Sequence, residues 1–550
     1  MDLVAKIKEF FKGEITSAEA DLEKYSRDAS LFKIKPQLVV IPQDVEDIKN
    51  LVKFVSDHKS ENSGLALTVR SGGTDMTGGA LSESIIVDVA KHINRLKEVG
   101  NDYVVVEPGM FYRDFEKETL KKNLLLPSYP ASREICTVGG MVANNSGGEK
   151  TLRYGKTIDY VAEVKVILRD GQEYVFKPVS ESELEAKKSQ SDLEGGIYRQ
   201  ISDLAVNNYD ILQKAKPRVS KNSSGYYLWD VYNPVKKTLD ISKLIVGSQG
   251  TLGIVTEIKF SLVKPKKHRR LLVIFLKDGK PLAQIVQKIL EFGPESFESY
   301  DDHTFKIALK FLPELAKKLK GGLVRLVFNF LHELGLILLN GVPKMVLLAE
   351  FSGDTEDEPY NKARVAERSL EELKLSTKIS MPGYDTEKYW VIRRESFNFL
   401  RHKIKKLRAA PFIDDIIVKP EHLPQFLPQL YEVLDDYAII YTVAGHVGDG
   451  NFHIIPLMDL TDPKAKNLIV QISRRVYDLV IKFGGSISAE HNDGLIRGPY
   501  LRQFFGQEVF NLFEEVKKVF DPEGIFNPGK KTGASLDYSL DHLDSAPKNQ

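Results

Sequence analysis

Residues 132–155 read SREICTVGGMVANNSGGEKTLRYG, and this stretch says more about the fold than any other part of the chain. It is rich in Gly, Ser, Thr and Asn, yet it also holds apolar side chains such as Ile135, Val138 and Met141. A solvent-exposed loop does not need them, whereas the wall of a cofactor site must both pack on an aromatic ring and hydrogen-bond its polar edge. The stretch therefore predicts a cofactor wall, with a buried connector as the alternative.

A second glycine-rich stretch, RSGGTDMTGG (70–79), follows the strand-like run LALTV (65–69). Glycine permits positive φ and close approach of the backbone to a ligand. Successive amide N–H groups can then bind phosphate oxygens without a lysine. The alternative is an ordinary glycine-rich loop. The stretch is not a GxGxxG fingerprint or a P-loop, and GIFNPGKK (524–531) lacks the Ser or Thr that a P-loop requires after its lysine.

The alternation of apolar residues predicts a mixed α+β fold. Strand-like runs occur at LVVIP (38–42), LALTV (65–69), IIVDV (85–89) and YVVVEPG (103–109), and helical patterns occur at 45–59 and 112–123. VAEVKVILRDGQEYVF (161–176) reads as two strands around an Asp170–Gly171 turn. LIVGSQGTLGIVTEIKFSL (244–262) reads as further strands, and the KPKKH that follows is typical of a linker to a second lobe.

Composition excludes several classes of protein. The 550 residues suggest about three lobes, and 77 basic against 76 acidic residues argue against a nucleic-acid partner. The single cysteine, Cys136, cannot form an internal disulfide or hold an iron–sulfur cluster, which favours a cytoplasmic protein. No signal peptide is visible at the start. The most apolar region, 323–351, is interrupted by charged residues and does not fit a membrane span.

The stretch GHVGDGNFH (445–453) suggests a metal site. If Asp449–Gly450 forms a two-residue hairpin turn, His446 lies opposite His453 on one face of the hairpin. Opposed residues have Cβ atoms about 5 Å apart, so two imidazoles could bind one ion. Structural histidines are the alternative interpretation.

A third potential ligand lies in SAEHNDG (488–494). Glu490 and His491 are adjacent and tend to point in different directions, so one can ligate a metal while the other faces a substrate. Together with His446 and His453, Glu490 would complete a set of two histidines and one carboxylate with open coordination positions. Alone, this motif is weak.

Taken together, the motifs resemble a known family. They are YSRDAS, RSGGTDMTGG, VEPG, SREICTVGGMVANNSGGEKTLRYGKTIDYV, KNSSGY, VGSQGTLGIVTEI, GHVGDGNFH, AEHNDG and FNPGK, and they extend from about residue 25 to residue 533. The chain resembles the FAD-linked oxidoreductases of the vanillyl-alcohol-oxidase-like superfamily. Within it, the chain is most similar to the group of D-lactate dehydrogenase, glycolate oxidase and D-2-hydroxyglutarate dehydrogenase.

The resemblance implies the domain order. An N-terminal segment (1–35) would precede a PCMH-type FAD-binding domain (36–264) and an α+β substrate-binding cap domain (265–475). A short helical C-terminal part (476–533) would return to the flavin. The polar residues 534–550 are predicted to be disordered.

The resemblance also implies a set of FAD-binding residues, with residues 70–79 around the pyrophosphate. The set is Arg70, Ser71, Gly72, Gly73, Thr74, Thr77, Gly78, Gly79, Pro108, Gly109, Ser132, Thr137, Gly139, Gly140, Asn144, Ser146, Gly147, Gly250, Ile254 and Asn527. The usual flavin-linking histidine is absent from the glycine-rich loop, so FAD should be bound non-covalently.

For the chemistry, the resemblance implies a divalent metal, with zinc expected and manganese or iron as alternatives. Its ligands would be His446, His453 and Glu490. His491 would act as base, and Arg393 or Arg394 in YWVIRRES would bind the substrate carboxylate, which an arginine fork suits.

Three positions depart from the family pattern. Asp75 and Ser71 replace residues that are usually glycine, which would reshape the phosphate loop. Ile413 stands where the hydroxyglutarate enzymes use a lysine for the second carboxylate, which argues against a dicarboxylate substrate.

The expected reaction is oxidation of a small 2-hydroxy acid, lactate- or glycolate-like, to the 2-oxo acid. Metal-assisted deprotonation would accompany hydride transfer to FAD. Electrons would pass to a quinone, an electron-transfer protein or oxygen. The apolar segment 323–343 could rest on the inner face of a membrane and favour a quinone, and a buried cap helix is the alternative. Two rival functions remain: a non-redox flavin-dependent transferase resembling alkylglycerone-phosphate synthase, and a flavin-free metal hydrolase or binding protein.

Overall fold

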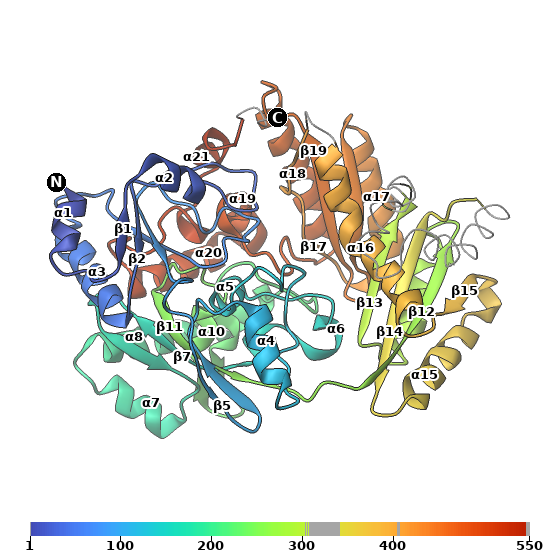
Figure 1. Cartoon of the computed structure of the whole chain (residues 1–550), viewed down its shortest axis with the longest axis horizontal. Coiled ribbons are helices and arrows are strands. Elements are labelled where there is room, and N and C mark those ends of the chain that lie inside the picture. The colour runs from blue at the N-terminus through green and yellow to red at the C-terminus, as the bar shows by residue number, and fades with distance from the viewer. Residues whose placement is uncertain (1, 303, 305, 307–340, 404–406, 546–550) are drawn as a thin grey trace.

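The computed structural model of the chain describes residues 2–302, 304, 306, 341–403 and 407–545. Figure 1 shows two lobes side by side, with the N-terminal half and the last helices in one and the middle of the sequence in the other. Nearly all of the apolar segment 323–343 lies outside the described residues. None of the described helices is long and apolar enough to cross a membrane.

The first lobe contains two of the three large sheets in the described part of the chain. The smaller sheet has the order β1-β2-β4-β3, with β4 parallel to both β2 and β3. Its strands are β1 (Glu14–Thr16), β2 (Leu38–Ile41), β3 (Leu67–Arg70) and β4 (Ile85–Asp88). Helix α3 (Val45–His58) packs its apolar face into the core of this sheet, and the carboxylate of Asp44 caps its first turn.

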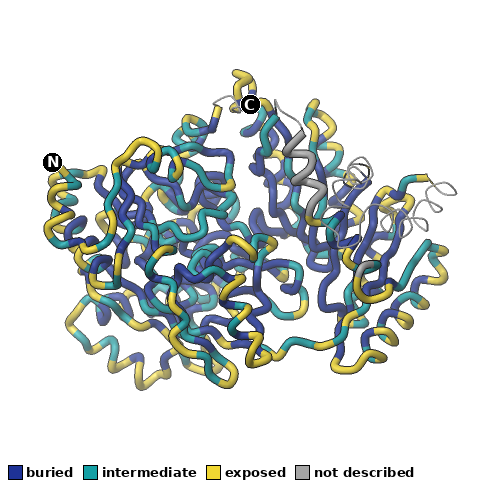
Figure 2. Tube along the Cα trace, viewed as in Figure 1, coloured by how far each residue is buried: buried dark blue, intermediate teal, exposed yellow. Residues whose placement is uncertain are grey.

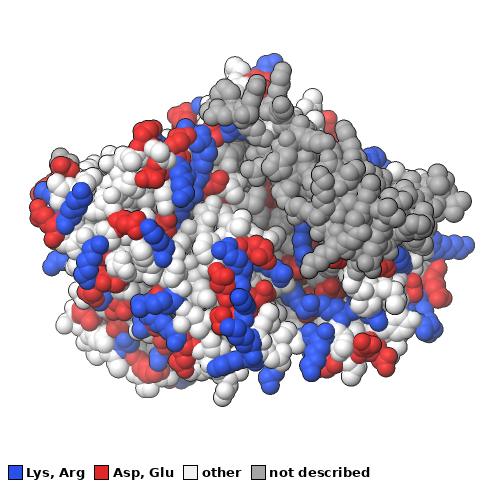
Figure 3. Space-filling model, in the orientation of Figure 1, with Lys and Arg blue, Asp and Glu red and all other residues white. Residues whose placement is uncertain are grey.

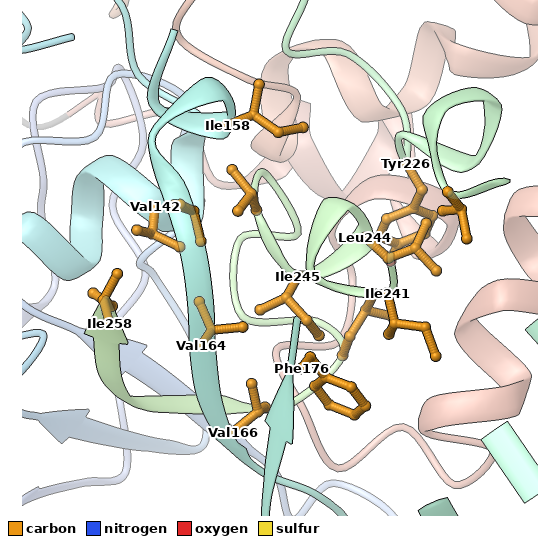
Figure 4. Packing of buried hydrophobic residues seen from close by; sticks show 14 of the residues in the cluster. Val142, Ile158, Val164, Val166, Phe176, Tyr226, Ile241, Leu244, Ile245 and Ile258 are labelled. Atoms are coloured by element: carbon orange, nitrogen blue, oxygen red, sulfur yellow. The ribbon is translucent and has the colours of Figure 1, made fainter. Parts of the chain in front are cut away.

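The second sheet is antiparallel, with the order β5-β6-β11-β7-β8. Its strands are β5 (Leu96–Val99), β6 (Tyr103–Val106), β7 (Val161–Ile167), β8 (Glu173–Phe176) and β11 (Ile254–Ser261). Val164 and Val166 alternate along β7, so both point to one face of the sheet. Figure 4 shows them packed near Leu244 and Ile245 of α10 (Ser242–Ile245) in the main core of this lobe.

Several further elements complete the lobe. They are α1 (Leu3–Lys8), α2 (Glu19–Tyr25), α4 (Tyr112–Leu120), α5 (Val138–Asn144), α6 (Thr151–Tyr154), α7 (Glu181–Lys188), α8 (Leu193–Asn207), α9 (Tyr209–Ala215) and the ribbon of β9 (Tyr232–Asn233) and β10 (Thr238–Leu239). Residues 244–245 end a helix, so the strand predicted to start there is wrong. The other strands predicted for this half are present.

The second lobe is built on an antiparallel sheet of order β15-β12-β14-β13-β18-β19-β16, with β17 also paired to β19. Its strands are β12 (His268–Leu276), β13 (Ser296–Asp301), β14 (Met345–Gly353), β15 (Ser376–Ile379), β16 (Arg408–Ala409), β17 (Ile416–Ile417), β18 (Ile440–His446) and β19 (Asn451–Met458). Its helices are α11 (Leu282–Leu290), α15 (Asp357–Arg368), α16 (Tyr384–Lys403), α17 (Leu423–Asp435) and α18 (Ala465–Lys482). Buried side chains from the sheet and from α11, α15, α17 and α18 form a core of their own.

The chain then returns to the first lobe through α19 (Gly494–Arg497) and α20 (Leu501–Phe520). Phe513 of α20 packs edge-on against Trp229, with ring centroids 6.1 Å apart. Helix α18 packs in the second lobe and runs through the predicted boundary at 475/476, so the return begins only after α18 ends.

Residues 534–545, predicted to be disordered, are ordered. Helix α21 (Leu536–Asp541) starts at Ser535, whose side chain caps it. Leu543 pairs with Phe32 in an isolated bridge, and the Asp544 carboxylate accepts from Arg27 Nε at 2.8 Å and pairs with Arg408. The prediction of disorder rested on the polar composition of the segment. Composition does not reveal contacts such as those of Asp544 with Arg27 and Arg408, which are far from it in the sequence.

Figure 2 shows buried segments running through the interior of both lobes and across the region where they meet, while exposed residues follow the outer helices. On the face seen in Figure 3, acidic and basic side chains are interspersed. The two kinds of charge, which are nearly equal in number in the sequence, are therefore also mixed in space on this face.

Candidate active site

A cavity of about 1020 Å³ lies between the two lobes. Its walls come from the loop after β3, the start of α5, the hairpin of β18 and β19, and the segment before α19. The volume is at the upper end of the range for small-molecule sites, about 300–1000 Å³. The cavity can therefore take an extended ligand.

The loop 70–79 is shaped by one of its own side chains, Asp75. One carboxylate oxygen accepts from the backbone N–H groups of Thr77 (2.9 Å) and Gly79 (2.7 Å). The other accepts from the side-chain amide of Asn144 at 2.8 Å. The residue that replaces a usual glycine thus folds the loop on itself and ties it to α5.

The start of α5 forms the facing wall. The Thr137 hydroxyl accepts from the backbone N–H of Gly140 and donates to Ser71 Oγ at 2.5 Å. A Cβ on Gly139 would lie 2.4 Å from Pro108 Cβ, so only glycine fits at this close approach. The two glycine-rich stretches are therefore held together at the cavity wall.

Most predicted FAD-binding residues line the cavity. They are Arg70, Ser71, Gly72, Gly73, Thr74, Gly79, Pro108, Ser132, Thr137, Gly139, Gly140, Asn144, Ser146, Gly147 and Gly250. The Arg70 guanidinium donates to the carbonyls of Tyr25 (3.1 Å) and Arg27 (2.7 Å), so it anchors the N-terminal segment.

The other predicted FAD-binding residues do not line the cavity. They are Thr77, Gly78, Gly109, Ile254 and Asn527. Ile254 is fully buried in the core, and the backbone N–H of Gly109 donates to the Ile93 carbonyl. Asn527 supports the wall from behind, because its amide donates to the carbonyls of Gly79 (2.8 Å) and Gln249 (2.7 Å).

The histidine hairpin differs from the predicted register. His446 pairs with Asn451 and His453 pairs with Ala444, because the turn spans residues 447–450 and not Asp449–Gly450 alone. Asn451 and His453 are two residues apart on one strand and share a face. The two imidazoles still meet, diagonally, with ring centroids 5.2 Å apart.

His446 lies between two carboxylates. Its Nδ1 is 2.6 Å from Glu298 Oε1, and its Nε2 is 3.5 Å from Glu490 Oε2. Burial disfavours the protonated ring, but the charge of Glu298 outweighs this effect and raises the pKa of His446 to about 9. A carboxylate on Nδ1 is the usual partner of a histidine that ligates a metal through Nε2.

A second carboxylate, Asp414, holds two imidazoles at once. Its oxygens lie 3.1 Å from His453 Nδ1 and 2.9 Å from His491 Nδ1, and the two rings stack with centroids 5.1 Å apart. Burial opposes ionisation of Asp414, yet the two imidazoles keep its pKa below the usual range. Burial lowers the pKa of His491, whereas Asp415 and Asp414 raise it, to about 9.

Asp415 orients the backbone that carries the third predicted ligand. Its Oδ2 accepts from the N–H groups of Glu490 (2.8 Å) and His491 (2.7 Å) and from the Ser488 hydroxyl (2.9 Å). Its φ is +66°, unusual for a residue with a side chain. Adjacent acidic residues thus fix both the imidazoles and the Glu490 loop.

Glu490 also contacts a buried cation. Lys221 Nζ lies 2.6 Å from Glu490 Oε1 and 3.1 Å from Asp449 Oδ2, and the lysine side chain is 0 % exposed. Burial lowers the pKa of this ammonium, but Asp449 and Glu490 more than compensate and raise it. Lys221 therefore stays charged beside the predicted metal ligand.

Both predicted substrate-binding arginines reach the cavity from α16, each paired with a carboxylate. Arg393 Nη2 is 3.1 Å from Glu298 Oε2, and Arg394 Nη2 is 2.7 Å from Glu149 Oε2. Arg393 is more buried, with 15 % of its side chain exposed against 46 % for Arg394. Among the residues that the structure describes, its buried Nε has no hydrogen-bond partner, so it has a donor to offer to a substrate.

Ile413 does not line the cavity. It is fully buried in the core of the second lobe. A residue at this position does not face the cavity, so Ile413 does not exclude a dicarboxylate substrate.

The donor set fits a divalent metal. Ligand atoms of Asp415, His453, Glu490 and His491 lie within 4.8 Å of one another. The predicted ligand His446 is outside this group, with its Nε2 3.5 Å from Glu490 Oε2. Imidazole nitrogens and carboxylate oxygens suit zinc, manganese and iron. The predicted ligands are thus brought together.

Several residues of this site were missed from the sequence: Glu298, Asp414, Asp415 and Lys221. The pair Asp414–Asp415 stands inside the apolar run PFIDDIIV, and two acidic residues at buried positions could have signalled a site. Glu298 precedes His446 by 148 residues, and no local pattern links them.

Two segments of the chain match known families. Residues 36–177 match the family described as FAD binding domain. Residues 265–531 match the family described as FAD linked oxidases, C-terminal domain.

Two relatives are similar along most of the chain. The chain is 28 % identical over 538 residues to D-2-hydroxyglutarate dehydrogenase of Escherichia coli (strain K12), covering 94 % of this chain and 50 % of that protein. It is 25 % identical over 543 residues to D-lactate dehydrogenase of Anaerostipes hadrus, covering 96 % and 97 %. The chain therefore spans about half the length of the first relative and nearly all of the second.

Two solved structures share the fold. The 4-ethylphenol oxidase from Gulosibacter chungangensis, in its isoeugenol complex, aligns with a TM-score of 0.67 at 16 % identity, covering 96 % of each chain. An alkyldihydroxyacetonephosphate synthase aligns with a TM-score of 0.65 at 15 % identity, covering 96 % of this chain and 84 % of that one. At such identities the likeness concerns the fold, which confirms the predicted α+β architecture with its PCMH-type domain.

Proposed function

Because the chain belongs to the FAD-linked oxidases with a PCMH-type FAD-binding domain, we propose that it is an FAD-dependent dehydrogenase of a small 2-hydroxy acid. The main support for this proposal is the set of residues that line one cavity. The glycine-rich walls and the cluster of His446, His453, Glu490 and His491 line the same cavity. The names of the relatives, a D-2-hydroxyglutarate dehydrogenase and a D-lactate dehydrogenase, support the same class of substrate.

FAD would lie non-covalently along loop 70–79 and the start of α5. When bound, it supplies the acceptor for the hydride that leaves C2 of the substrate. The backbone N–H groups of the glycine-rich loop would face the pyrophosphate. Asp75 keeps this loop folded through its bonds to Thr77 and Gly79.

A divalent ion, with zinc as first candidate and manganese or iron as alternatives, would be held by His446, His453 and Glu490. When bound, it supplies a Lewis acid that lowers the pKa of the substrate hydroxyl. Glu298 and Asp414 hold Nδ1 of the two histidines and so direct Nε2 of each ring to the ion.

His491 would take the hydroxyl proton at Nε2, since Asp414 lies against its Nδ1. A base must be neutral, and a divalent ion held by the neighbouring Glu490 and His453 would repel the proton and lower the pKa of His491 from about 9. Arg393 would bind the substrate carboxylate, with Arg394 as the second candidate. The electron acceptor would be a quinone or an electron-transfer protein.

The test is anaerobic titration of the FAD-loaded chain with D- and L-2-hydroxy acids, including lactate, glycolate and 2-hydroxyglutarate. The flavin absorbance should bleach with one of these acids, the matching 2-oxo acid should appear, and metal analysis of the same sample should find a divalent ion. Product exchange without bleaching would favour a flavin-dependent transferase. A chain that stays colourless after FAD reconstitution would overturn both readings.

A further inference from the structure

Lys221 is the cation of the site to which the proposed mechanism gives no role. It belongs to the segment after α9, yet it contacts the hairpin turn through Asp449 and the 488–494 loop through Glu490. Its side chain is 0 % exposed, and those of Asp449 and Glu490 are only 2 % and 6 % exposed. This buried triad joins both lobes at the predicted metal ligand.

We propose that Lys221 is a positioning residue that restricts Glu490 to one ligating oxygen, Oε2. This inference rests on the proposed function, since it assumes that Glu490 ligates a metal. The two oxygens of Glu490 already have different partners. Oε1 accepts from Lys221 Nζ at 2.6 Å, and Oε2 is 3.5 Å from His446 Nε2.

The lysine cannot easily release Oε1. Its ammonium is also held by Asp449 at 3.1 Å, and Asp449 is fixed in turn by the Ser220 hydroxyl at 2.6 Å. Moving the ammonium away would leave buried carboxylates without a counter-ion, which is strongly destabilising. The arrangement therefore favours a single metal–oxygen bond from Glu490.

A single metal–oxygen bond from Glu490 would lower the affinity of the site for the metal and leave a coordination position for the substrate. A carboxylate that binds through both oxygens fills an additional coordination position, whereas a catalytic site keeps a position open for substrate. A positive charge next to the ligand also repels a divalent ion. Lys221 thus weakens metal binding and keeps room for the hydroxy acid.

Lys221→Met tests these two effects, because methionine has similar length and no charge. Its affinity for Zn²⁺, measured by competition with a chromophoric chelator, should rise by on the order of tenfold, the lower end of the effect of residues behind metal ligands. Without metal the variant should melt at a lower temperature than wild type, because two carboxylates lose their cation, and Zn²⁺ should raise its Tm by more. At saturating Zn²⁺ its kcat/KM should fall.

Lys156→Met is the matched control. Lys156 is also buried, but it donates to the carbonyls of Asn222 (2.8 Å) and Ala489 (2.5 Å) and to the Ser223 hydroxyl. This variant should lose stability without any gain in Zn²⁺ affinity.

Equal or weaker Zn²⁺ binding by Lys221→Met, with wild type binding normally, would overturn the inference alone. Wild type that binds neither Zn²⁺ nor Mn²⁺ would instead overturn the metal site. If Lys221→Met does not fold, X-ray absorption of zinc-loaded wild type gives the answer. Glu490 should contribute one oxygen to the first coordination sphere, and two oxygens would contradict the proposal.

Discussion

At the scale of single residues, the histidines are positioned by carboxylates that are distant in sequence. His446 is held by Glu298, and His453 and His491 share Asp414. The His446 and His453 rings are therefore fixed by hydrogen bonds at Nδ1, and His491 Nδ1 lies in ion-pair contact with Asp414. These contacts leave Nε2 of each ring as the reactive nitrogen.

His446→Ala should separate the metal from the flavin. We expect the variant to lose its metal and to lower turnover by about 10²-fold, roughly 3 kcal/mol. FAD should stay bound because the glycine-rich walls are untouched. Metal analysis and the flavin spectrum of the same preparation measure both effects. His422→Ala, whose ring contacts the Phe483 carbonyl, is the control and should keep the metal. Full turnover in His446→Ala would disprove the metal assignment.

Asp75→Gly restores the residue usual at that position and should weaken FAD binding. The variant loses hydrogen bonds to Thr77, Gly79 and Asn144, each worth about 1 kcal/mol net, so FAD affinity should fall by at least about tenfold. The dissociation constant follows from the fluorescence of released flavin. Ser71→Gly, the other departure, loses only the bond from Thr137 and should have the smaller effect. The opposite order would show that Asp75 does not shape the loop.

The sequence was sufficient to predict four of the side chains that meet at the cavity but not the residues that hold them. His446, His453, Glu490 and His491 lie in two short motifs, where spacing and residue type are informative. Glu298, Asp414 and Lys221 act through tertiary contacts, with separations from 39 residues between Asp414 and His453 to 269 residues between Lys221 and Glu490. No periodicity encodes such a pairing.

At the scale of elements, the β18–β19 hairpin depends on a glycine in its turn. Gly450 has a φ of +73°, and a Cβ there would lie 1.9 Å from the Val418 carbonyl oxygen. The predicted two-residue turn placed the histidines directly opposite each other. With the longer turn, His446 pairs with Asn451 and not with His453. This shift of two residues changes the register but keeps both histidines on the same face of the hairpin.

Gly450→Ala should therefore disrupt the hairpin. We expect a loss of at least about 2 kcal/mol in the free energy of unfolding, together with weaker metal binding. Gly484→Ala is the matched control, because Gly484 has a φ of +64° with no atom within 4 Å of the added Cβ. Gly484→Ala therefore measures the cost of placing alanine at a positive φ without the steric clash that Gly450→Ala adds. Denaturant unfolding and metal analysis compare the two variants. Equal losses in the free energy of unfolding would show that the contact with Val418 is unimportant.

Apolar runs that end at turn residues were predicted well as strands. LVVIP, IIVDV and YVVVEPG correspond to β2, β4 and β6. The error at residues 244–245 came from an apolar run too short to distinguish a buried helix from a strand.

At the scale of the whole molecule, the lobes meet through buried charges. Lys150, the residue before α6, lies 3.2 Å from Glu295, which also pairs with Arg269 at 3.0 Å. Glu350 is nearby, 3.7 Å from Arg269. Burial of Glu350 outweighs the attraction to Arg269 and raises its pKa to about 7.

This raised pKa predicts a pH-dependent stability. Protonated Glu350 stabilises the fold fully below its unfolded pKa near 4.5, and the stabilisation is lost as pH rises through about 7. Glu350→Gln should therefore raise Tm at pH 8 to 9, by an amount equivalent to about 1–3 kcal/mol, with little change at pH 5. Thermal unfolding across this range provides the measurement.

Glu295→Gln is the control for that series. The pKa of Glu295 is lowered, because Lys150 and Arg269 outweigh its burial. The substitution removes the carboxylate that Lys150 and Arg269 share and should destabilise the protein throughout pH 5 to 9. A Glu350→Gln profile parallel to wild type would contradict the proposed titration.

The position of Asn527 has a consequence for biosynthesis. Its amide joins the carbonyls of Gly79 and Gln249, and Gly79 precedes it by 448 residues. A nascent chain still inside the ribosome therefore has its glycine-rich loops exposed but not yet braced. We therefore expect FAD to bind after translation, and a chain whose synthesis stops before residue 527 should fail to become yellow.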